Sequence, residues 1–150
     1  MKIRYKAPYV IDFDHVGEWV DLRTIQQENM SKDDDRLLSL GIAMELPEEF
    51  EAIVAPRSST FKRYGIMLNN SIGIIDSSFK GDSDIWRFPV HATRNCTIPP
   101  FARIAQFRIQ LSQKASAWTK IKWMFTSKIE FVKVYSLGNE DRGGIGSTGV

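Results

Sequence analysis

Apolar and polar residues alternate along two segments of this 150-residue chain. Residues 105–111 read Ala-Gln-Phe-Arg-Ile-Gln-Leu, and residues 50–54 read Phe-Glu-Ala-Ile-Val. Because successive side chains of a β-strand point to opposite faces, this pattern predicts strands with one buried face. Pro47 and Pro56 flank the earlier segment as turn signals, which is typical of an antiparallel sheet. Further short strands are predicted at residues 72–75, 86–90 and 129–134.

Helical patterns are scarce in comparison. Residues 58–64 predict one short helix, with Ser58 as its N-cap and Gly65 as the residue that ends it. Residues 112–127 fit two patterns, because their apolar side chains follow helical spacing and also alternate with polar residues. We predict a strand there and keep a helix as the alternative. The sequence therefore predicts an all-β domain with one short helix.

Composition favours one domain that does not bind through bulk charge. With 43% hydrophobic and 25% charged residues, the chain can bury one sizeable core but hardly two. A net charge of +2 argues against general binding to nucleic acid or a membrane, and no segment resembles a membrane span. The single cysteine, Cys96, excludes an internal disulfide, and residues 1–6 lack the apolar run of a signal peptide. We expect a reducing, cytoplasmic location.

Several common catalytic and binding motifs are missing. Two histidines and one cysteine cannot supply a zinc site at the usual spacings. No GxSxG or GxxxxGK[ST] motif is present, and no GxGxxG opens a helix after a strand. What remains are carboxylates, a basic loop with serines, a glutamine and a glycine-rich end. Together these suit the hydrolysis of a phosphate anhydride by an activated water.

The glycine-rich end covers residues 138–150 and contains Arg142, Ser147 and Thr148. Glycines let consecutive backbone N–H groups point into one concavity, and the cation and hydroxyls suit phosphate oxygens. We interpret the segment as a phosphate-binding arm, with a disordered tail as the alternative. The domain then divides into a catalytic part, 1–137, and its flexible arm.

Three further groups carry candidate chemistry. Asp76 directly follows an apolar strand, so it is a candidate general base, although an Asp before two serines commonly caps its own turn. Residues 56–59, Pro-Arg-Ser-Ser, offer a guanidinium and hydroxyls at a helix start that favours anions, or form an ordinary capped surface helix. Gln106 lies on the polar face of its strand, which solvent exposure alone would also explain.

Five segments carry a likeness that spans nearly the whole chain. They are Trp-Val-Asp-Leu-Arg at 19–23, Pro-Arg-Ser-Ser at 56–59, Gly-Ile-Ile-Asp at 73–76, Arg-Ile-Ala-Gln at 103–106 and the arm at 142–149. In order and spacing they resemble the trimeric dUTPase family, the deoxyuridine 5'-triphosphate nucleotidohydrolases, of Gram-positive bacterial or phage type. The resemblance implies a jelly-roll-like β-clip domain and a homotrimer with interfacial active sites, its C-terminal arms exchanged between subunits.

The resemblance also implies an activity and the residues that recognise the nucleoside. dUTP would be hydrolysed to dUMP and pyrophosphate, which keeps uracil out of DNA and supplies dUMP for dTMP synthesis. Asp76 would activate the water that attacks the α-phosphorus. Asn70 would contact uracil, Gly73 and Ile75 are further substrate-binding positions, and Phe79 stands where the family has a tyrosine beneath the deoxyribose.

Other positions match those that hold the triphosphate. Asp21 would support hydrated Mg²⁺ through water, while the ion itself binds mainly the phosphate oxygens of the substrate. The remaining substrate-binding positions implied by the resemblance are Arg57, Ser58, Ser59, Gln106, Arg142, Gly144, Ile145, Ser147 and Thr148.

The chain departs from the family in two informative places. Ile145 replaces the phenylalanine that covers uracil in many relatives, and the flat guanidinium of Arg87 is a candidate replacement. Its neighbours Trp86 and Phe88 are expected to face the core. The segment 112–127 looks longer than in relatives, so it is either extra packing or a surface for a repressor-type protein partner.

Two alternative functions stay open. A dCTP deaminase shares the fold and the phosphate motifs, but it would need a glutamate beside the cytosine amine. A phage-type regulatory protein would instead use the same motifs as a nucleotide-sensitive docking surface.

Overall fold

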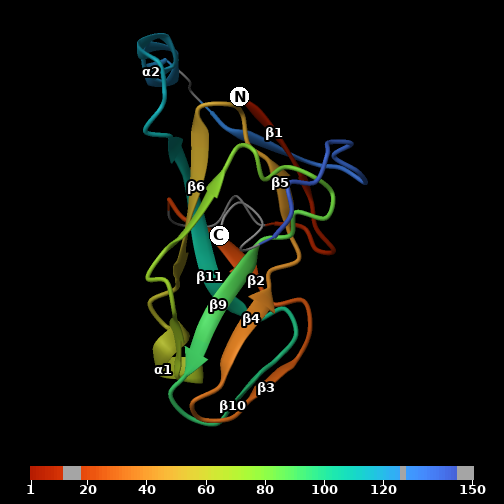
Figure 1. The fold of residues 1–150 in the computed structure, drawn as a ribbon, viewed down its shortest axis with the longest axis vertical. Helices are drawn as coiled ribbons and strands as arrows, with labels where there is room; N and C mark the ends of the chain where they lie inside the picture. The colour runs from red at the N-terminus through yellow and green to blue at the C-terminus, as the bar shows by residue number, and fades with distance from the viewer. Residues whose placement is uncertain (12–17, 126–127, 145–150) are drawn as a thin grey trace.

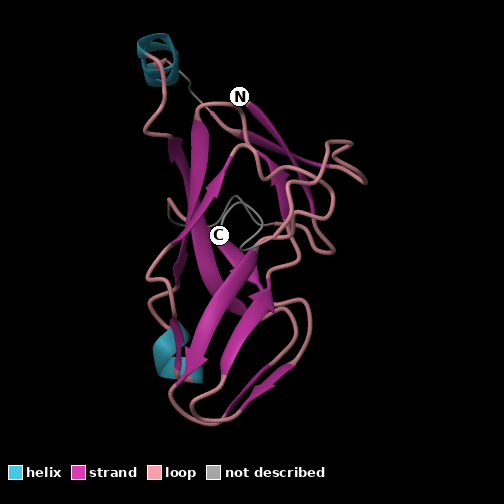
Figure 2. Ribbon diagram, viewed as in Figure 1, coloured by secondary structure: helices cyan, strands magenta, loops and turns pink. Residues whose placement is uncertain are grey.

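The computed structural model describes residues 1–11, 18–125 and 128–144, which form twelve strands and two helices (Figure 1). Figure 2 shows that strands make up the body of the molecule, with one helix at each end. The all-β expectation is confirmed, but the expectation of a single helix is wrong. The strands are β1 (Lys2–Lys6), β2 (Val20–Arg23), β3 (Glu28–Met30), β4 (Asp35–Ser39), β5 (Ala43–Glu45), β6 (Phe50–Pro56), β7 (Ile66–Leu68), β8 (Gly73–Asp76), β9 (Arg87–Ala92), β10 (Cys96–Ile98), β11 (Arg103–Leu111) and β12 (Glu130–Lys133).

The four-stranded sheet β2-β11-β6-β8 carries the candidate site residues Asp21, Gly73, Ile75, Asp76 and Gln106. It contains both alternating segments, and β6 buries Ala52 and Val54 while its other face is half-exposed, as the pattern predicted. The three other sheets have the orders β12-β1-β5, β4-β9-β7 and β10-β3. Within the four-stranded sheet, β11 pairs antiparallel with β2 and with β6, and β6 pairs antiparallel with β8.

One hydrophobic core lies between the sheets. Trp86 and Phe88 are 0% and 1% exposed, which confirms that both face the core. Trp86 meets Phe107 edge to face, with ring centroids 5.2 Å apart. Burying side chains of this size stabilises the fold by about 1.5–3 kcal/mol each.

Helix α1 (Thr60–Tyr64) follows β6 directly. Its first helical hydrogen bond runs from the N–H group of Arg63 to the carbonyl of Ser59, so the N-cap is Ser59 and not the expected Ser58. Gly65 ends the helix as predicted, with a left-handed φ of 66°. A Cβ atom there would lie 2.6 Å from Cγ of Arg94, so glycine is required by backbone and by space.

Helix α2 (Ala117–Met124) lies where we predicted a strand, and that prediction is wrong. Ser116 caps it by accepting a hydrogen bond from the N–H group of Thr119, at 3.2 Å. Trp123 packs against Phe50 of β6, with centroids 5.0 Å apart. The apolar residues of this segment also alternate with lysines, and that alternation favoured the strand prediction. Figure 1 shows α2 standing apart from the sheets, and no helix in the described part of the chain is long and apolar enough to cross a membrane.

Candidate active site

Three charged residues form a compact group at one end of the four-stranded sheet, and we call Asp21, Arg57 and Arg103 the arginine cluster. The carboxylate of Asp21 accepts from Nε of Arg57 at 2.6 Å and from Nη1 of Arg103 at 3.2 Å. Only 10% of the Asp21 side chain is exposed, so the pairing is only weakly screened by solvent. Asp21 accepts a hydrogen bond from the Nε–H group of Arg57, which fixes the orientation of the guanidinium plane. The terminal Nη groups of Arg57 are suited to binding an anion.

Ser58, Ser59 and Gln106 lie next to the arginine cluster. Ser58 is exposed and Ser59 half-buried in the turn that opens α1, and the Ser59 side chain makes no capping hydrogen bond. The Ser59 hydroxyl is therefore not committed to the helix cap. Gln106 lies opposite Ala55 of β6 and opposite Asp21 of β2. Its amide donates to the carbonyl of Pro56 at 3.2 Å, which fixes its orientation beside Arg57.

Asp76 is the last residue of β8, and its carboxylate is held from two sides. Oδ1 accepts from the N–H group and the hydroxyl of Ser78, at 2.9 and 2.5 Å. Oδ2 accepts from Nη1 of Arg142 at 2.7 Å. Partial burial acts to raise the pKa of Asp76, but the hydrogen bonds from Ser78 and Arg142 outweigh it and hold the pKa below its ordinary value. The carboxylate is thus ionised at neutral pH, as a general base must be.

The expected nucleoside contacts lie around the turn that joins β7 to β8, two strands that belong to different sheets. Asn70 is exposed at its tip, where its carbonyl accepts from the N–H group of Ile72 at 2.6 Å. Gly73 and Ile75 belong to β8, and Ile75 packs partly against the core. Phe79, just beyond Asp76, is also half-buried against the core. Arg87 is exposed at the start of β9, with its side chain on the face opposite its buried neighbours.

Within one chain, Asp76 lies far from the arginine cluster. Asp76 pairs with Glu51 of β6, whereas Gln106 pairs with Ala55, four residues further along the same strand. At strand spacings of about 3.3 Å per residue and about 4.8 Å between strands, Asp76 and Gln106 are roughly 16 Å apart. Both face the same side of the sheet, because directly paired residues share a face. One subunit therefore presents the candidate base and the candidate phosphate site as two separate groups.

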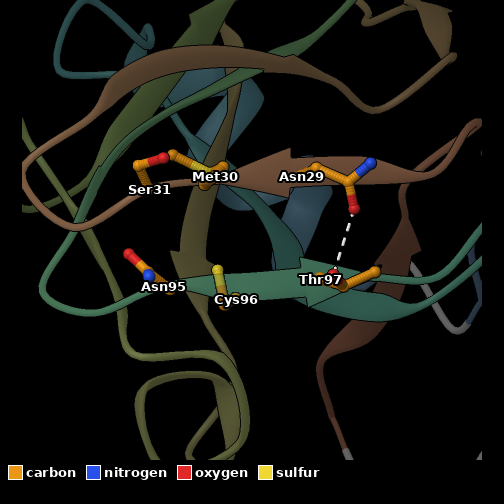
Figure 3. Close-up of a pocket in the computed structure, with 6 residues that line it drawn as sticks. All are labelled: Asn29, Met30, Ser31, Asn95, Cys96 and Thr97. Carbon is orange, nitrogen blue, oxygen red and sulfur yellow. Dashed lines mark hydrogen bonds between the residues drawn. The ribbon is translucent and has the colours of Figure 1, made fainter.

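A hollow of about 440 Å³ lies elsewhere, on strands β3 and β10. Figure 3 shows its lining, in which Thr97 donates a hydrogen bond to the side chain of Asn29. Burial raises the pKa of the Cys96 thiol, so this sulfur stays protonated at neutral pH. The lining has neither a cation nor a carboxylate, and we do not assign the chemistry to it.

The dUTPase family model matches residues 20–147, which include the arginine cluster, Asp76 and most of the arm. The chain belongs to the dUTPase family. It is 46% identical to the SPbeta prophage-derived deoxyuridine 5'-triphosphate nucleotidohydrolase YosS of Bacillus subtilis (strain 168), over 89% of this chain and 84% of that protein. It is 31% identical to the deoxyuridine 5'-triphosphate nucleotidohydrolase of Clostridium acetobutylicum, over 91% of this chain and 86% of that protein.

Solved dUTPases share the fold. The Staphylococcus bacteriophage 80alpha dUTPase aligns with a TM-score of 0.66 at 12% identity, over 76% of this chain and 92% of its own. The D95N mutant dUTPase from phage phi11 of S. aureus, whose structure details the coordination of a structural Mg(II) ion, aligns with a TM-score of 0.65 at 11% identity, over 76% of this chain and 93% of its own. The dUTPase fold predicted from the five segments is thus confirmed.

The dUTPase arm is described only as far as Gly144, which is exposed. The structure brings Arg142 together with Asp76 of the same chain. Ile145, Ser147 and Thr148 lie outside the described residues, so their expected contacts are not tested. The expected exchange between subunits concerns the whole arm, 138–150, and stays a prediction, while its described part contacts its own chain at Asp76 and Asp84.

The sequence did not predict a role for two carboxylates of this dUTPase, Asp82 and Asp84. Asp84 is 1% exposed and accepts from the backbone N–H groups of Arg142 and Gly143. Asp82 accepts from the hydroxyl of Ser136 and from the N–H groups of Leu137 and Gly138. The bond from Ser136, followed by the others, holds the pKa of Asp82 well below its ordinary value. A possible signal was the run Asp-Ser-Asp directly after Gly81, because an acidic pair in a short loop suits free backbone donors.

The residues of this dUTPase fit Mg²⁺ only through water. In residues 1–11, 18–125 and 128–144, no three His, Cys, Asp or Glu side chains gather into a metal-binding group. Both oxygens of Asp21 already bind guanidinium groups, so direct ligation of a metal would have to displace an arginine. This donor set suits an ion that keeps its water shell.

Proposed function

We propose that the protein is a dUTP diphosphatase that hydrolyses dUTP to dUMP and pyrophosphate. The observation that carries the proposal is the ionised carboxylate of Asp76, which Ser78 and Arg142 orient at the end of β8. An oriented carboxylate can accept a proton from a water as that water attacks the α-phosphorus. The atoms balance: the water oxygen bonds to the α-phosphorus, and pyrophosphate leaves.

The arginine cluster supplies charge for the triphosphate. Arg57 offers its Nη groups to phosphate oxygens, while the hydroxyls of Ser58 and Ser59 and the amide of Gln106 complete the polar surface beside it. Mg²⁺ on the phosphates would neutralise charge there, with Asp21 supporting its hydration shell. From the arm, Arg142, Gly144, Ile145, Ser147 and Thr148 would cover the substrate.

The turn between β7 and β8, together with β8, would account for nucleoside specificity. Asn70, with backbone groups at Gly73 and Ile75, would read the hydrogen-bonding edge of uracil. The ring of Phe79 would support the deoxyribose, and Arg87 would cover the base. A site built from fixed hydrogen-bonding groups rejects a base that leaves those groups unpaired.

We further propose that the active site forms between copies of the chain in a homotrimer. The separation of roughly 16 Å between Asp76 and Gln106 on one sheet face is too large for one substrate atom to contact both side chains directly. Ile74, 59% exposed, lies on this face between the two groups, where a neighbouring copy would cover it. Residues 1–137 would form the catalytic part, and 138–150 its arm, in a cytoplasmic enzyme.

Pyrophosphate release from dUTP, dCTP, dTTP and UTP with Mg²⁺ tests the function. Release from dUTP alone is expected, and Asp76→Asn should slow it by about 10²- to 10⁴-fold because the base is lost. Glu130→Gln, which alters only an exposed carboxylate paired with Lys2, is the control and should leave the rate unchanged. Equal rates in wild type and Asp76→Asn would refute the role of Asp76, and ammonia release from dCTP would favour a deaminase.

A further inference from the structure

The loop after β8 and the start of the arm are joined through carboxylates and backbone N–H groups. Asp84, in the loop, accepts from N–H of Arg142 at 2.9 Å and from N–H of Gly143 at 3.1 Å. It also accepts from N–H of Gly81 at 2.9 Å, so a single buried carboxylate ties its own loop to the arm.

The contact is reciprocal and very close. Asp141, beside Arg142, accepts from the N–H group of Ser83 at 2.7 Å. At Gly81, a Cβ atom would lie 2.1 Å from Oδ1 and 2.5 Å from Cα of Asp141, so only glycine allows this approach. Asp82 holds the segment that leads into the arm, because it accepts hydrogen bonds from the N–H groups of Leu137 and Gly138, at 3.1 and 3.2 Å.

The result of this anchorage is the placement of one guanidinium. With the backbone of Arg142 bound to Asp84, the Arg142 side chain reaches Oδ2 of Asp76 at 2.7 Å. Asp84 and Asp76 flank the same arm residue, one holding its backbone and the other its side chain. A carboxylate can accept from all three N–H groups, because it has lone pairs on both oxygens and no donor of its own. The side-chain amide of asparagine would place its NH₂ group against one of these N–H donors.

We propose that Asp84 is a positioning residue for dUTP hydrolysis, holding Arg142 beside the carboxylate of Asp76. The inference rests on the proposed function and adds the anchor of the arm to it. Asp84 acts through Arg142 and does not touch the substrate. Its removal therefore matters only while Arg142 is present.

The test is a double-mutant cycle with Asp84→Asn and Arg142→Ala, measuring kcat and KM for dUTP with Mg²⁺. Asp84→Asn is expected to lower kcat by about 10- to 100-fold, since small misplacements of a catalytic contact cost this much. In the Arg142→Ala background the same change should cost nothing further. Asp34→Asn, at a half-buried carboxylate that pairs with Arg36 and accepts from the N–H group of Ser31, is the control.

A second readout does not depend on turnover. The carboxyl carbon of Asp76 can be titrated by NMR, and the charged groups that face it are Arg142 from the arm and Glu51 on the paired strand β6. Both Asp84→Asn and Arg142→Ala should raise its titration midpoint, because each removes the Arg142 contact. A loss of general stability alone would not move this midpoint in the folded protein.

Asp84 is buried, so Asp84→Asn can fail to fold. The exposed Asp141→Ala variant removes the contact with Ser83 instead, and it should lower kcat several-fold and again only when Arg142 is present. Additive losses in the cycle, or an unchanged Asp76 titration, would overturn the inference. A wild-type chain that fails to hydrolyse dUTP would overturn the proposed function, and the titration would still decide the role of Asp84.

Discussion

At the level of single residues, the state of Asp76 is set by opposing effects on one carboxylate. Partial burial favours the protonated form, and the donors from Ser78 and Arg142 favour the ionised form. The donors prevail, so the pKa lies below the ordinary 3.8. An enzyme that needs this carboxylate as a base gains a wide pH range in which the base is ready.

The pH dependence of dUTP hydrolysis follows from this balance. In the wild type, the Asp76 base is lost only as the pH falls through its lowered pKa, below the ordinary 3.8. Arg142→Ala leaves the effect of burial on the pKa of Asp76 less opposed, so the acid limb of kcat/KM should move to higher pH. A pH–rate profile from pH 3 to 8 checks this, and identical acid limbs in the two proteins would contradict it.

Among the charged residues of the site, Asp21 should contribute the most to stability. Asp21→Asn leaves Arg57 and Arg103 without their shared counter-charge, so the free energy of unfolding should fall by about 1–3 kcal/mol, less than for a fully buried pair because the arginines are partly solvated. Urea denaturation measures it. Glu130→Gln, at an exposed pair, should change the value by less than about 0.5 kcal/mol. Equal losses of unfolding free energy in Asp21→Asn and Glu130→Gln would contradict a stabilising role for the arginine cluster.

At the level of elements, α2 depends on a carboxylate distant in sequence. Glu49 accepts from the N–H group of Ser116 at 2.7 Å and also binds the hydroxyl of Thr119. The Thr119 and Ser116 contacts hold the pKa of Glu49 below its ordinary 4.5. This anchorage is therefore complete above that pH and weakens as the pH falls through the lowered pKa.

Packing of α2 should depend on only one of its tryptophans. Trp123→Ala removes the contact with Phe50, whose loss of about 0.5–1.5 kcal/mol beyond buried area should speed amide exchange in α2 about 10-fold. Trp118→Ala changes a side chain that is 71% exposed and should leave exchange as it is. Hydrogen exchange followed by mass spectrometry distinguishes the variants, and equal protection in both would mean that the Phe50 contact does not hold the helix.

The sequence predicted what depends on local pattern. Alternation located β6 and β11, and the Gly65 signal located the end of α1. It failed at α2, because the partners of that helix, Glu49 and Phe50, lie more than 60 residues away in the chain. In the site, residue types identified Asp76 and Arg57, but the anchoring role of Asp84 depends on a fold that brings residues 84 and 142 together.

At the level of the whole molecule, the separation of Asp76 from the arginine cluster predicts complementation between inactive chains. Asp76→Asn and Arg57→Ala chains, each deficient alone, should recover about one quarter of wild-type activity after equal mixing and reassembly, since a quarter of interfacial sites then combine two intact halves. Pyrophosphate release before and after reassembly measures it. A mixture of Asp76→Asn with Asp76→Ala serves as the control. No recovery would place the whole site within one chain.

The parallel pairing of β1 with β12 sets Lys2 opposite Glu130. Because more than 120 residues separate the two strands, β1 leaves the ribosome long before β12 during synthesis. Until β12 follows, this edge of β1 exposes a row of backbone donors and acceptors to strands of neighbouring nascent chains. The emergence of β12 therefore fixes the moment at which this edge of the sheet is covered.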